Sequence, residues 1–272
     1  MLHQLLTLAC DAEASAMLAF AHPDDETVAL GARLHRLQSP LLVHVTDGAP
    51  RNLDDSTAHG FGSLADYRRH REQELICALQ LAGLERARRI RLGIPDQESC
   101  LGLQSLTRDL RRLILRHLPQ VVFTHPYEGG HPDHDACAFA VHRAVGSLEA
   151  TGRRPPVIVE AAFYHRGQQG MVTGRFLPHS DQTEEIALPL SEEERRRREA
   201  LLACFSSQRD ILQCFPADRE LFRIAPRYDF HQPPHEGPVF YDQHSWGMTS
   251  RHFCELALEA DALDEEILPA CG

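Results

Sequence analysis

The sequence contains no lysine, because all 28 of its basic residues are arginine. Mechanisms that form a Schiff base on a lysine, or that use a lysine amine as the base, are therefore excluded. The chain also lacks any C-x-x-C pair, and most of its eight cysteines lie inside apolar segments. We therefore expect reduced, buried thiols rather than disulfides.

Long hydrophobic runs are absent as well. No apolar stretch reaches 18 residues, and the first residues lack the basic and apolar segments of a signal peptide. We therefore expect a cytoplasmic protein that does not interact with a membrane. The formal net charge of −11 argues against nucleic acid as a partner, since duplex binding requires clustered cations.

Apolar segments alternate with amphipathic segments over the first part of the chain. Residues 2–10 suggest a short amphipathic helix that packs on the body of the protein. Strands are predicted at 15–21, 41–46, 90–92, 120–124 and 157–164. Helices are predicted at 26–38, 64–82, 103–117 and 132–148. This order is typical of an α/β fold, in which a mostly parallel, Rossmann-like sheet has helices on both faces.

The pattern is less regular after residue 170. Residues 171–190 are consistent with a hairpin, and residues 191–215 are helical. Residues 225–247 are rich in proline, histidine and aromatic residues, and they form either an aromatic wall over a site or a packed tail. We interpret the whole chain, 1–272, as a single domain with a core at 15–165 and a C-terminal appendage at 166–272.

Two polar clusters follow two of the predicted strands. The first runs from His22 to Glu26 (HPDDE) and follows the strand at 15–21. The second runs from His131 to Asp135 (HPDHD) and follows the strand at 120–124. Ligands of open α/β sheets bind outside the carboxyl ends of the strands, so the two clusters can meet over one sheet edge.

These residue types match a catalytic zinc site, which typically has three protein ligands and one open position. His22 and Asp25 are three residues apart, so both side chains fall on one side of a first helical turn, and His134 supplies the third ligand. Asp24 points elsewhere and stays free, while Asp133 is placed to bond to an imidazole. Each cluster taken singly is also explained by helix capping or by the helix dipole, but together they favour a metal site.

The motif AHPDDE at 21–26, with HPDH at 131–134, resembles the LmbE/PIG-L family of zinc-dependent N-deacetylases. These enzymes remove acyl groups, usually acetyl, from amino sugars and their conjugates. The resemblance covers about residues 15–165 and implies that His22, Asp25 and His134 bind zinc.

The resemblance also implies roles for other residues. Asp24 corresponds to the general base, and His131 to the acid or oxyanion stabiliser, tuned by Asp133. Because an opposite charge raises the pKa of an imidazole, we expect Asp133 to keep His131 protonated. An arginine of an R-x-x-E helix often contacts substrate in the family, and Arg71 fits that pattern. Some relatives carry a tyrosine close before the second motif, whereas Tyr127 in this chain is displaced from that place.

These assignments imply a metal-dependent hydrolase that removes an N-acyl group from a small amino sugar or its conjugate, with a bell-shaped pH dependence. Zinc is the implied cofactor, and iron(II) suits the same ligands. Asp47 and Arg51, in the loop after the second predicted strand, are further candidates for binding sugar hydroxyls. Relatives often assemble as trimers or hexamers, which leaves a homo-oligomer open.

Two other functions fit the same motifs. A zinc amidase acting on a thiol conjugate or a natural-product amide would differ only in the shape of its pocket. A non-catalytic sugar-binding relative would need neither Asp24 nor His131, so their presence argues against it. A glycosidase is excluded, because adjacent carboxylates cannot flank a bond at the separation of about 5–9 Å that glycosidases use.

Overall fold

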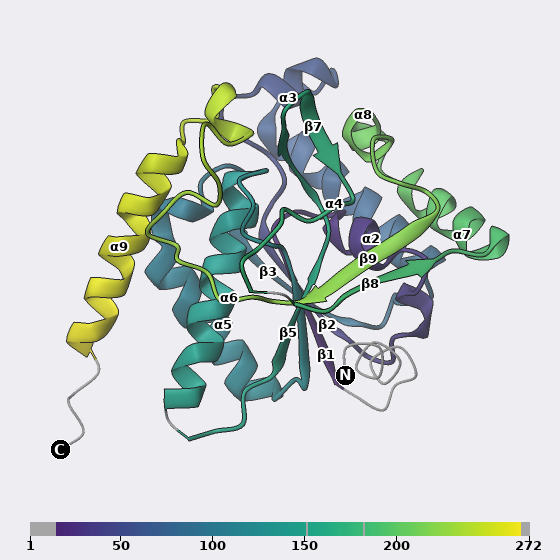
Figure 1. The fold of residues 1–272 in the computed structure, drawn as a ribbon. Coiled ribbons are helices and arrows are strands. Elements are labelled where there is room, and N and C mark those ends of the chain that lie inside the picture. Colours follow the sequence, from purple (N-terminus) through teal and green to yellow (C-terminus); the bar gives the residue numbers. More distant parts are fainter. Residues whose placement is uncertain (1–14, 151, 182, 268–272) are drawn as a thin grey trace.

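A computed structural model describes residues 15–150, 152–181 and 183–267, so the helix predicted at 2–10 lies outside the described residues. The main sheet contains β1 (Ala16–Phe20), β2 (Leu41–Thr46), β3 (Arg88–Ile94), β4 (Val121–Thr124), β5 (Val157–Ala161), β8 (Glu185–Pro189) and β9 (Arg219–Ile224). Its seven strands follow the order β3-β2-β1-β4-β5-β9-β8 (Figure 1). Strands β1 to β5 are parallel, whereas β9 and β8 are antiparallel to their neighbours. The predicted mostly parallel sheet is confirmed.

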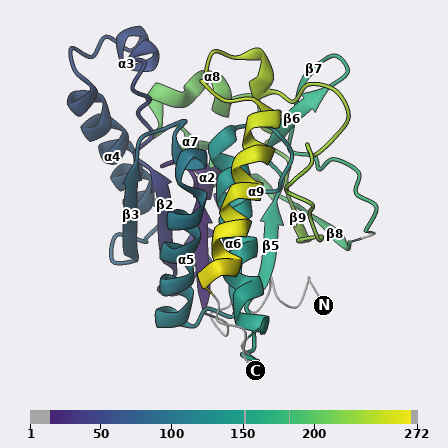
Figure 2. The ribbon, with the colours of Figure 1, turned by 90° about the vertical axis from the view of Figure 1, so that its left-hand side faces the viewer.

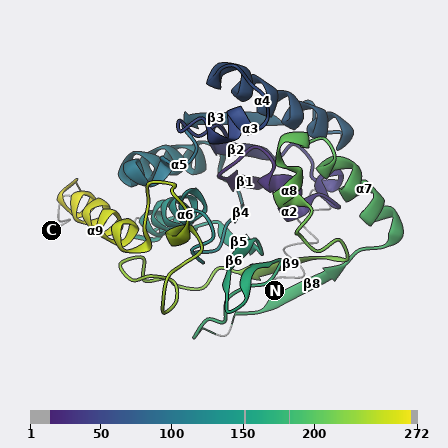
Figure 3. The same ribbon diagram turned by 90° about the horizontal axis from the view of Figure 1, so that it is seen from above.

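Helices cover both faces of this sheet, as the alternation predicts (Figure 3). One face is covered by α2 (Asp25–Leu30), α4 (Leu64–Leu81) and α7 (Glu192–Leu202). The other is covered by α5 (Leu103–His117), α6 (Pro132–Ala150) and α9 (Ser250–Ile267). Figure 2 shows α9 lying along α5 and α6. No helix among the described residues has the length and apolar character needed to cross a bilayer.

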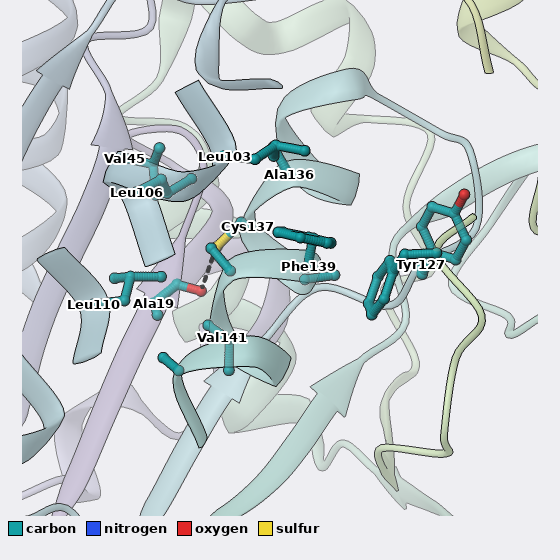
Figure 4. Close-up of a cluster of buried hydrophobic side chains, with 14 of the residues drawn as sticks. Ala19, Val45, Leu103, Leu106, Leu110, Tyr127, Ala136, Cys137, Phe139 and Val141 are labelled. Atoms are coloured by element: carbon teal, nitrogen blue, oxygen red, sulfur yellow. Dashed lines mark hydrogen bonds between the residues drawn. The ribbon is translucent and has the colours of Figure 1, made fainter. Parts of the chain in front are cut away.

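The central strands are apolar on both sides because both sides are covered. Leu18 and Phe20 of β1 enter the cluster beneath α2 and α4, whereas Met17 and Ala19 enter the cluster beneath α5 and α6. Figure 4 shows the second cluster, in which the Cys137 thiol donates a hydrogen bond to the carbonyl of Ala19 at 3.3 Å. The cysteines in the described part of the chain are free thiols, as expected, although Cys77, Cys204 and Cys214 lie outside the buried core.

The helix predicted at 26–38 ends early, because tertiary contacts occupy the groups that would continue it. The backbone N–H of Ala32 donates to the carboxylate of Glu220 on β9 at 2.8 Å. The carbonyl of Val28, which would be its helical acceptor, instead accepts a hydrogen bond from Arg198 on α7 at 3.2 Å. The end of α2 therefore depends on residues far away in the sequence.

The C-terminal part also differs from the local predictions. The hairpin predicted within 171–190 is wrong, because β7 (Gly170–Thr173) pairs with β6 (Tyr164–Gly167) and β8 pairs with β9. The strand predicted at 157–164 is divided between β5 and β6. Segment 191–215 is helical only in α7, a short 3₁₀ turn and α8 (Arg209–Leu212), and the loop after β2 contains α3 (Asp54–Ala58). The segment after 166 thus extends the sheet itself beyond β5.

The loop from β4 to α6 packs tightly on β6 through a glycine. A Cβ placed on Gly130 would lie 2.1 Å from the carbonyl oxygen of Tyr164. The preceding Gly129 has φ +69°, which favours glycine, and a Cβ there would lie 2.5 Å from Val239. Glycine at these two positions therefore allows the loop to approach β6 and the segment before α9.

Gly130→Ala should destabilise the protein by about 1–3 kcal/mol, because either the backbone of β6 or the loop must move to admit the methyl group. The matched control is Gly146→Ala on the exposed side of α6, where a Cβ meets nothing within 4 Å. That change should instead stabilise the protein by up to about 1 kcal/mol, since alanine is the better helix former. Thermal unfolding of both variants is the measurement. A Gly130→Ala variant as stable as the wild type would contradict the described approach of the loop.

Candidate active site

The two polar clusters lie where the strand order reverses, between the adjacent strands β1 and β4. This switch point is the usual ligand-binding place of an open α/β sheet. The turn after β1 is fixed by its own carboxylate, because the backbone N–H of His22 donates to Asp25 Oδ2 at 2.7 Å. The backbone amide of Asp24 in turn donates to the carbonyl of His22 at 3.0 Å. These short contacts hold His22 and Asp25 side by side.

The three predicted metal ligands form a compact triangle. His22 Nδ1 lies 3.3 Å from Asp25 Oδ2 and 3.2 Å from His134 Nε2, which lies 3.5 Å from Asp25 Oδ1. Ligands of a tetrahedral zinc ion, with bonds of about 2.0–2.2 Å, lie about 3.3–3.6 Å apart. The donor atoms of these three side chains, counting both Asp25 oxygens, therefore lie at separations close to those around a tetrahedral zinc ion, and three protein ligands would leave a fourth position.

The electrostatic surroundings also favour a cation at this place. Burial alone would lower the pKa of His22, but nearby Asp96, Asp133 and Asp25 together raise it well above its ordinary value. The three ligand side chains are buried, with His22 the most exposed at 8%. A buried site that stabilises positive charge, and whose donors are two imidazoles and a carboxylate, fits a divalent transition metal.

His125 supports the triangle and was not identified from the sequence. Its ring stacks on that of His134, with centroids 3.9 Å apart, and its Nε2 lies 3.3 Å from Asp25 Oδ2. The backbone N–H of Ala21 donates to the same nitrogen at 3.0 Å. Burial and the neighbouring His134 lower the pKa of His125 to about 3, so its ring is neutral. One sequence signal could have identified His125. It is followed by a proline directly after a predicted strand, and both motifs also begin with a His-Pro pair.

Asp24 lies in the same pocket but outside the triangle, as predicted. Its Oδ2 accepts hydrogen bonds from Arg71 Nη1 and Nη2, both at 3.2 Å. Burial raises the pKa of Asp24 to about 6, and the charge of Arg71 opposes this rise. Arg71 passes close to Gly48, where a Cβ would lie 2.8 Å from Arg71 Nε. Arg71, predicted as a substrate contact, thus lines the pocket and positions Asp24.

One turn later on α4, Glu74 joins this helix to the turn after α7. Its carboxylate accepts hydrogen bonds from Ser206 Oγ at 2.8 Å and from the N–H and hydroxyl of Ser207 at 2.8 Å and 2.6 Å. Gln208, the next residue, lines the pocket and donates to the hydroxyl of Tyr67 on α4 at 3.0 Å. Helix α4, which carries the R-x-x-E motif, therefore contacts both the candidate base Asp24 and the segment of the pocket lining that contains Gln208.

The surroundings of His131 disfavour the protonated ring that we predicted. Burial and the neighbouring His22 lower its pKa well below the ordinary value, although Asp133 opposes the shift. The backbone N–H of Asp133 donates to His131 Nδ1 at 3.1 Å, and the Asp133 carboxylate lies 3.8 Å from the same nitrogen. Nδ1 therefore acts as an acceptor, which leaves the proton of a neutral ring on Nε2, 3.7 Å from Asp96 Oδ1.

The Asp133 carboxylate instead holds the loop after β3. It accepts hydrogen bonds from Gln97 N at 2.6 Å, Ser99 N at 3.0 Å and Ser99 Oγ at 2.5 Å, and it lies 3.3 Å from His22 Nε2. Burial alone would raise the pKa of Asp133, but the hydrogen bond with His22 and the nearby imidazole charges lower it. This contact directs Nε2 of His22 toward a carboxylate and leaves Nδ1 for a metal, a common outer-sphere arrangement.

The same loop brings Asp96 to 3.2 Å from His22 Nε2. A second group of possible ligands thereby forms, with atoms within 4.8 Å of one another: His22, Asp96, His131 and Asp133. The carboxylate of Asp133 is already bound by three donors of the loop, so this group is the poorer metal site. The triangle remains the candidate metal centre among the described residues.

A cavity of about 100 Å³ opens beside these groups. Its polar lining includes Asp55, Arg71, Asp96, Gln97 and Gln208. Its apolar lining includes Val28, Phe163, Tyr164, Ile211, Leu212 and Phe215. Most of these residues were not identified from the sequence, since they come from five separate segments that only the fold brings together.

Three other residues considered in the sequence lie away from this cavity. Arg51 has a side chain 65% exposed and pairs with Glu98 at 3.0 Å. Asp47 pairs with Arg68 and lines a neighbouring cavity of about 290 Å³. Tyr127 is buried in the core, where its hydroxyl donates to the carbonyl of Gln232 at 2.9 Å. The tyrosine that lines the pocket is Tyr164.

Comparison with known proteins gives the family. A family profile described as PIG-L, GlcNAc-PI de-N-acetylase, matches residues 17–145. This match spans both motifs and all three candidate ligands. Residues 17–145 are a PIG-L domain. The resemblance to the LmbE/PIG-L family is therefore confirmed.

Solved structures show a similar fold that extends beyond the matched segment. The zinc inhibited form of the teicoplanin deacetylase Orf2 is similar with a TM-score of 0.60 at 18% identity, covering 79% of this chain and 99% of that chain. The N,N'-diacetylchitobiose deacetylase from Pyrococcus horikoshii, complexed with its inhibitor MPG, is similar with a TM-score of 0.51 at 18% identity, covering 78% and 82%. No curated protein matches the chain in sequence.

A protein with a similar fold is named for a different reaction. GalB, the 4-carboxy-2-hydroxymuconate hydratase from Pseudomonas putida KT2440, is similar with a TM-score of 0.52 at 15% identity, covering 79% of this chain and 98% of that chain. At such identities the likeness shows the fold alone. The reaction must therefore be argued from the site of this protein.

Replacing a ligand of the triangle should remove the metal. We expect about one zinc ion per chain in the purified protein, and its loss in His22→Ala, Asp25→Ala and His134→Ala. Outer-sphere changes typically weaken metal binding by about 10–100-fold, so loss of a ligand should exceed that range. Elemental mass spectrometry after dialysis is the measurement, with His252→Ala, on the exposed part of α9, as the control. Full zinc content in His134→Ala would contradict the assignment.

Proposed function

We propose that this PIG-L protein is a zinc-dependent N-deacetylase that removes an acetyl group from a small amino sugar or its conjugate, with iron(II) as a possible replacement for zinc. The proposal depends on one observation. A triangle of metal ligands lies in the same pocket as a buried carboxylate that belongs to no ligand set. Binding of a sugar or a metal alone would require no such carboxylate, whereas amide hydrolysis requires a base.

A divalent metal held by His22, Asp25 and His134 would polarise the amide carbonyl and acidify water. Asp24 then takes the proton of the attacking water, and Arg71 holds its carboxylate in place for this step. His131 donates a hydrogen bond through Nε2 to the oxygen that becomes negative, as a neutral ring can do.

The leaving amine must gain a proton when the C–N bond breaks. His131, which the family resemblance assigns as acid or oxyanion stabiliser, and Asp24, which carries the proton taken from water, are the two candidate donors. The hydrogen bond that His131 Nδ1 accepts from the Asp133 amide supports a neutral His131, which has no spare proton to transfer. We therefore infer that Asp24 returns to the amine the proton that it took from water.

The polar and the apolar residues that line the pocket both support an acylated sugar as the substrate. Carboxylate, amide and guanidinium groups of the polar lining suit sugar hydroxyls, and Asp96 and Gln97 are among them. The apolar side suits the methyl of an acetyl group, and a volume of about 100 Å³ favours a short acyl chain. Asp47 and Arg51 lie outside this cavity, so only a substrate that extends beyond the amino sugar could contact them.

Asp24→Asn should keep the metal and lose activity. We expect the rate of acetate release from N-acetylglucosamine derivatives to fall by about 10²–10⁴-fold, the usual contribution of a positioned base. Zinc content should stay at the wild-type value, which separates this variant from ligand replacements. Asp54→Asn, at the exposed start of α3, is the matched control and should leave the rate unchanged.

The same assay decides between the candidate substrates. Release of amine from a thiol conjugate, with no acetate released from any N-acetylglucosamine derivative, would replace the amino-sugar proposal with the amidase alternative. Wild-type activity in Asp24→Asn would refute the role of this residue as the base.

A further inference from the structure

An arc of aromatic rings connects two residues of the pocket, Tyr164 and His131. The ring of Tyr164 contacts Phe240, with centroids 5.6 Å apart, and Phe240 contacts His244 at 4.7 Å. His244 stacks on Trp246 at 4.3 Å and an angle of 12°, and Trp246 contacts His131 at 4.8 Å. We call residues 240–246 the aromatic arc. It begins and ends at the candidate active site.

The arc is held in place by hydrogen bonds on both sides. The backbone N–H of Phe240 donates to the carbonyl of Gly129, in the loop before the second motif, at 2.9 Å. The hydroxyl of Tyr241 donates to Asp135 Oδ2 at 3.2 Å. The carboxylate of Asp242 accepts from Ser250 N at 2.6 Å, which ties the arc to the start of α9. A segment fixed in this way presents its rings in a defined position beside the pocket.

Core packing does not explain all of these rings. His244 is exposed, and Phe240 and Trp246 are partly exposed. Trp246 contacts the core cluster beneath α5 and α6, but it is not fully covered by it. A row of partly exposed rings next to a polar pocket is typical of a surface that binds flat or apolar faces of a ligand.

The arc also lies outside residues 17–145, the part of the chain that matches the PIG-L profile. The ligand triangle and Asp24 lie inside that part. The catalytic groups and the arc therefore belong to different portions of the sequence, which meet at His131.

We propose that the aromatic arc binds a ring attached to the amino sugar, and so selects conjugates over the free sugar. The ring is a second pyranose or an aromatic aglycone, since both present a flat face that packs on aromatic side chains. This inference rests on the proposed deacetylase function, because it assumes that the sugar amide lies against the metal ligands. His244 and the free part of Trp246 provide the contact surface.

The single tryptophan of the chain gives a direct binding assay. In the Asp24→Asn background, the emission of Trp246 is titrated with the methyl glycoside of N-acetylglucosamine, with its phenyl glycoside and with N,N'-diacetylchitobiose. We expect the phenyl glycoside, the disaccharide or both to bind about threefold to tenfold more tightly than the methyl glycoside. The compound with the larger gain identifies the kind of ring. His244→Ala should remove this gain.

Kinetics test the same inference during turnover. The ratio of kcat/KM for the phenyl glycoside or the disaccharide to kcat/KM for the methyl glycoside should fall toward one in Trp246→Ala. Trp246→Phe, which keeps an aromatic ring, should retain most of the preference. His252→Ala, an exposed histidine on the following helix, should leave the ratio unchanged.

The outcomes separate this inference from the function on which it rests. Deacetylation of all three compounds at the same kcat/KM, with equal affinities in the titration, would overturn the arc as a binding surface and leave the deacetylase intact. Absence of acetate release from every compound would refute the proposed function. In that case a tighter complex with a ring-bearing compound, lost in His244→Ala, would still support the arc.

Discussion

The Asp133 carboxylate accepts three hydrogen bonds from the loop after β3 and lies against Nε2 of His22. This single buried group connects the ends of three strands, because His22 follows β1, the loop follows β3 and Asp133 follows β4. It fixes which nitrogen of His22 faces the other ligands, and it brings Asp96 to the edge of the pocket. The candidate ligand triangle, the hydrogen bond to Nδ1 of His131 and the polar pocket lining all depend on this arrangement of main-chain and side-chain donors.

The parallel sheet places the three loops that the Asp133 carboxylate connects. Strands β1, β2 and β4 of the parallel sheet carry apolar side chains on both faces, and the reversal of strand order between β1 and β4 leaves room at their carboxyl ends. Both motifs begin directly after these two strands, so the packing of the core sets the distance between His22 and His134. Strands β9 and β8 extend the sheet at one edge. Glu220 on β9 accepts a hydrogen bond at the end of α2, the helix that carries Asp25.

The sequence alone was sufficient to predict the features that are determined by neighbouring residues. The apolar strands before the two motifs, the spacing of His22 and Asp25 and the free position of Asp24 could be predicted, because each depends on neighbouring residues. The sequence could not predict the end of α2, the pairing of β8 with β9 or the place of Tyr164. Each of these features depends on a partner that is distant in the sequence. The pKa direction of His131 also depends on a distant residue, because burial beside His22 outweighs the charge of Asp133.

The contacts of α4 have a consequence for how the site can change. Arg71 holds Asp24, while Glu74 binds the turn that carries Gln208, so one rigid helix spans from the reacting centre to the far wall. Substitutions in the serines of that turn would remove hydrogen bonds to Glu74 and leave Asp24 and the candidate metal ligands unchanged. One wall of the pocket can therefore vary between related sequences while both motifs stay the same.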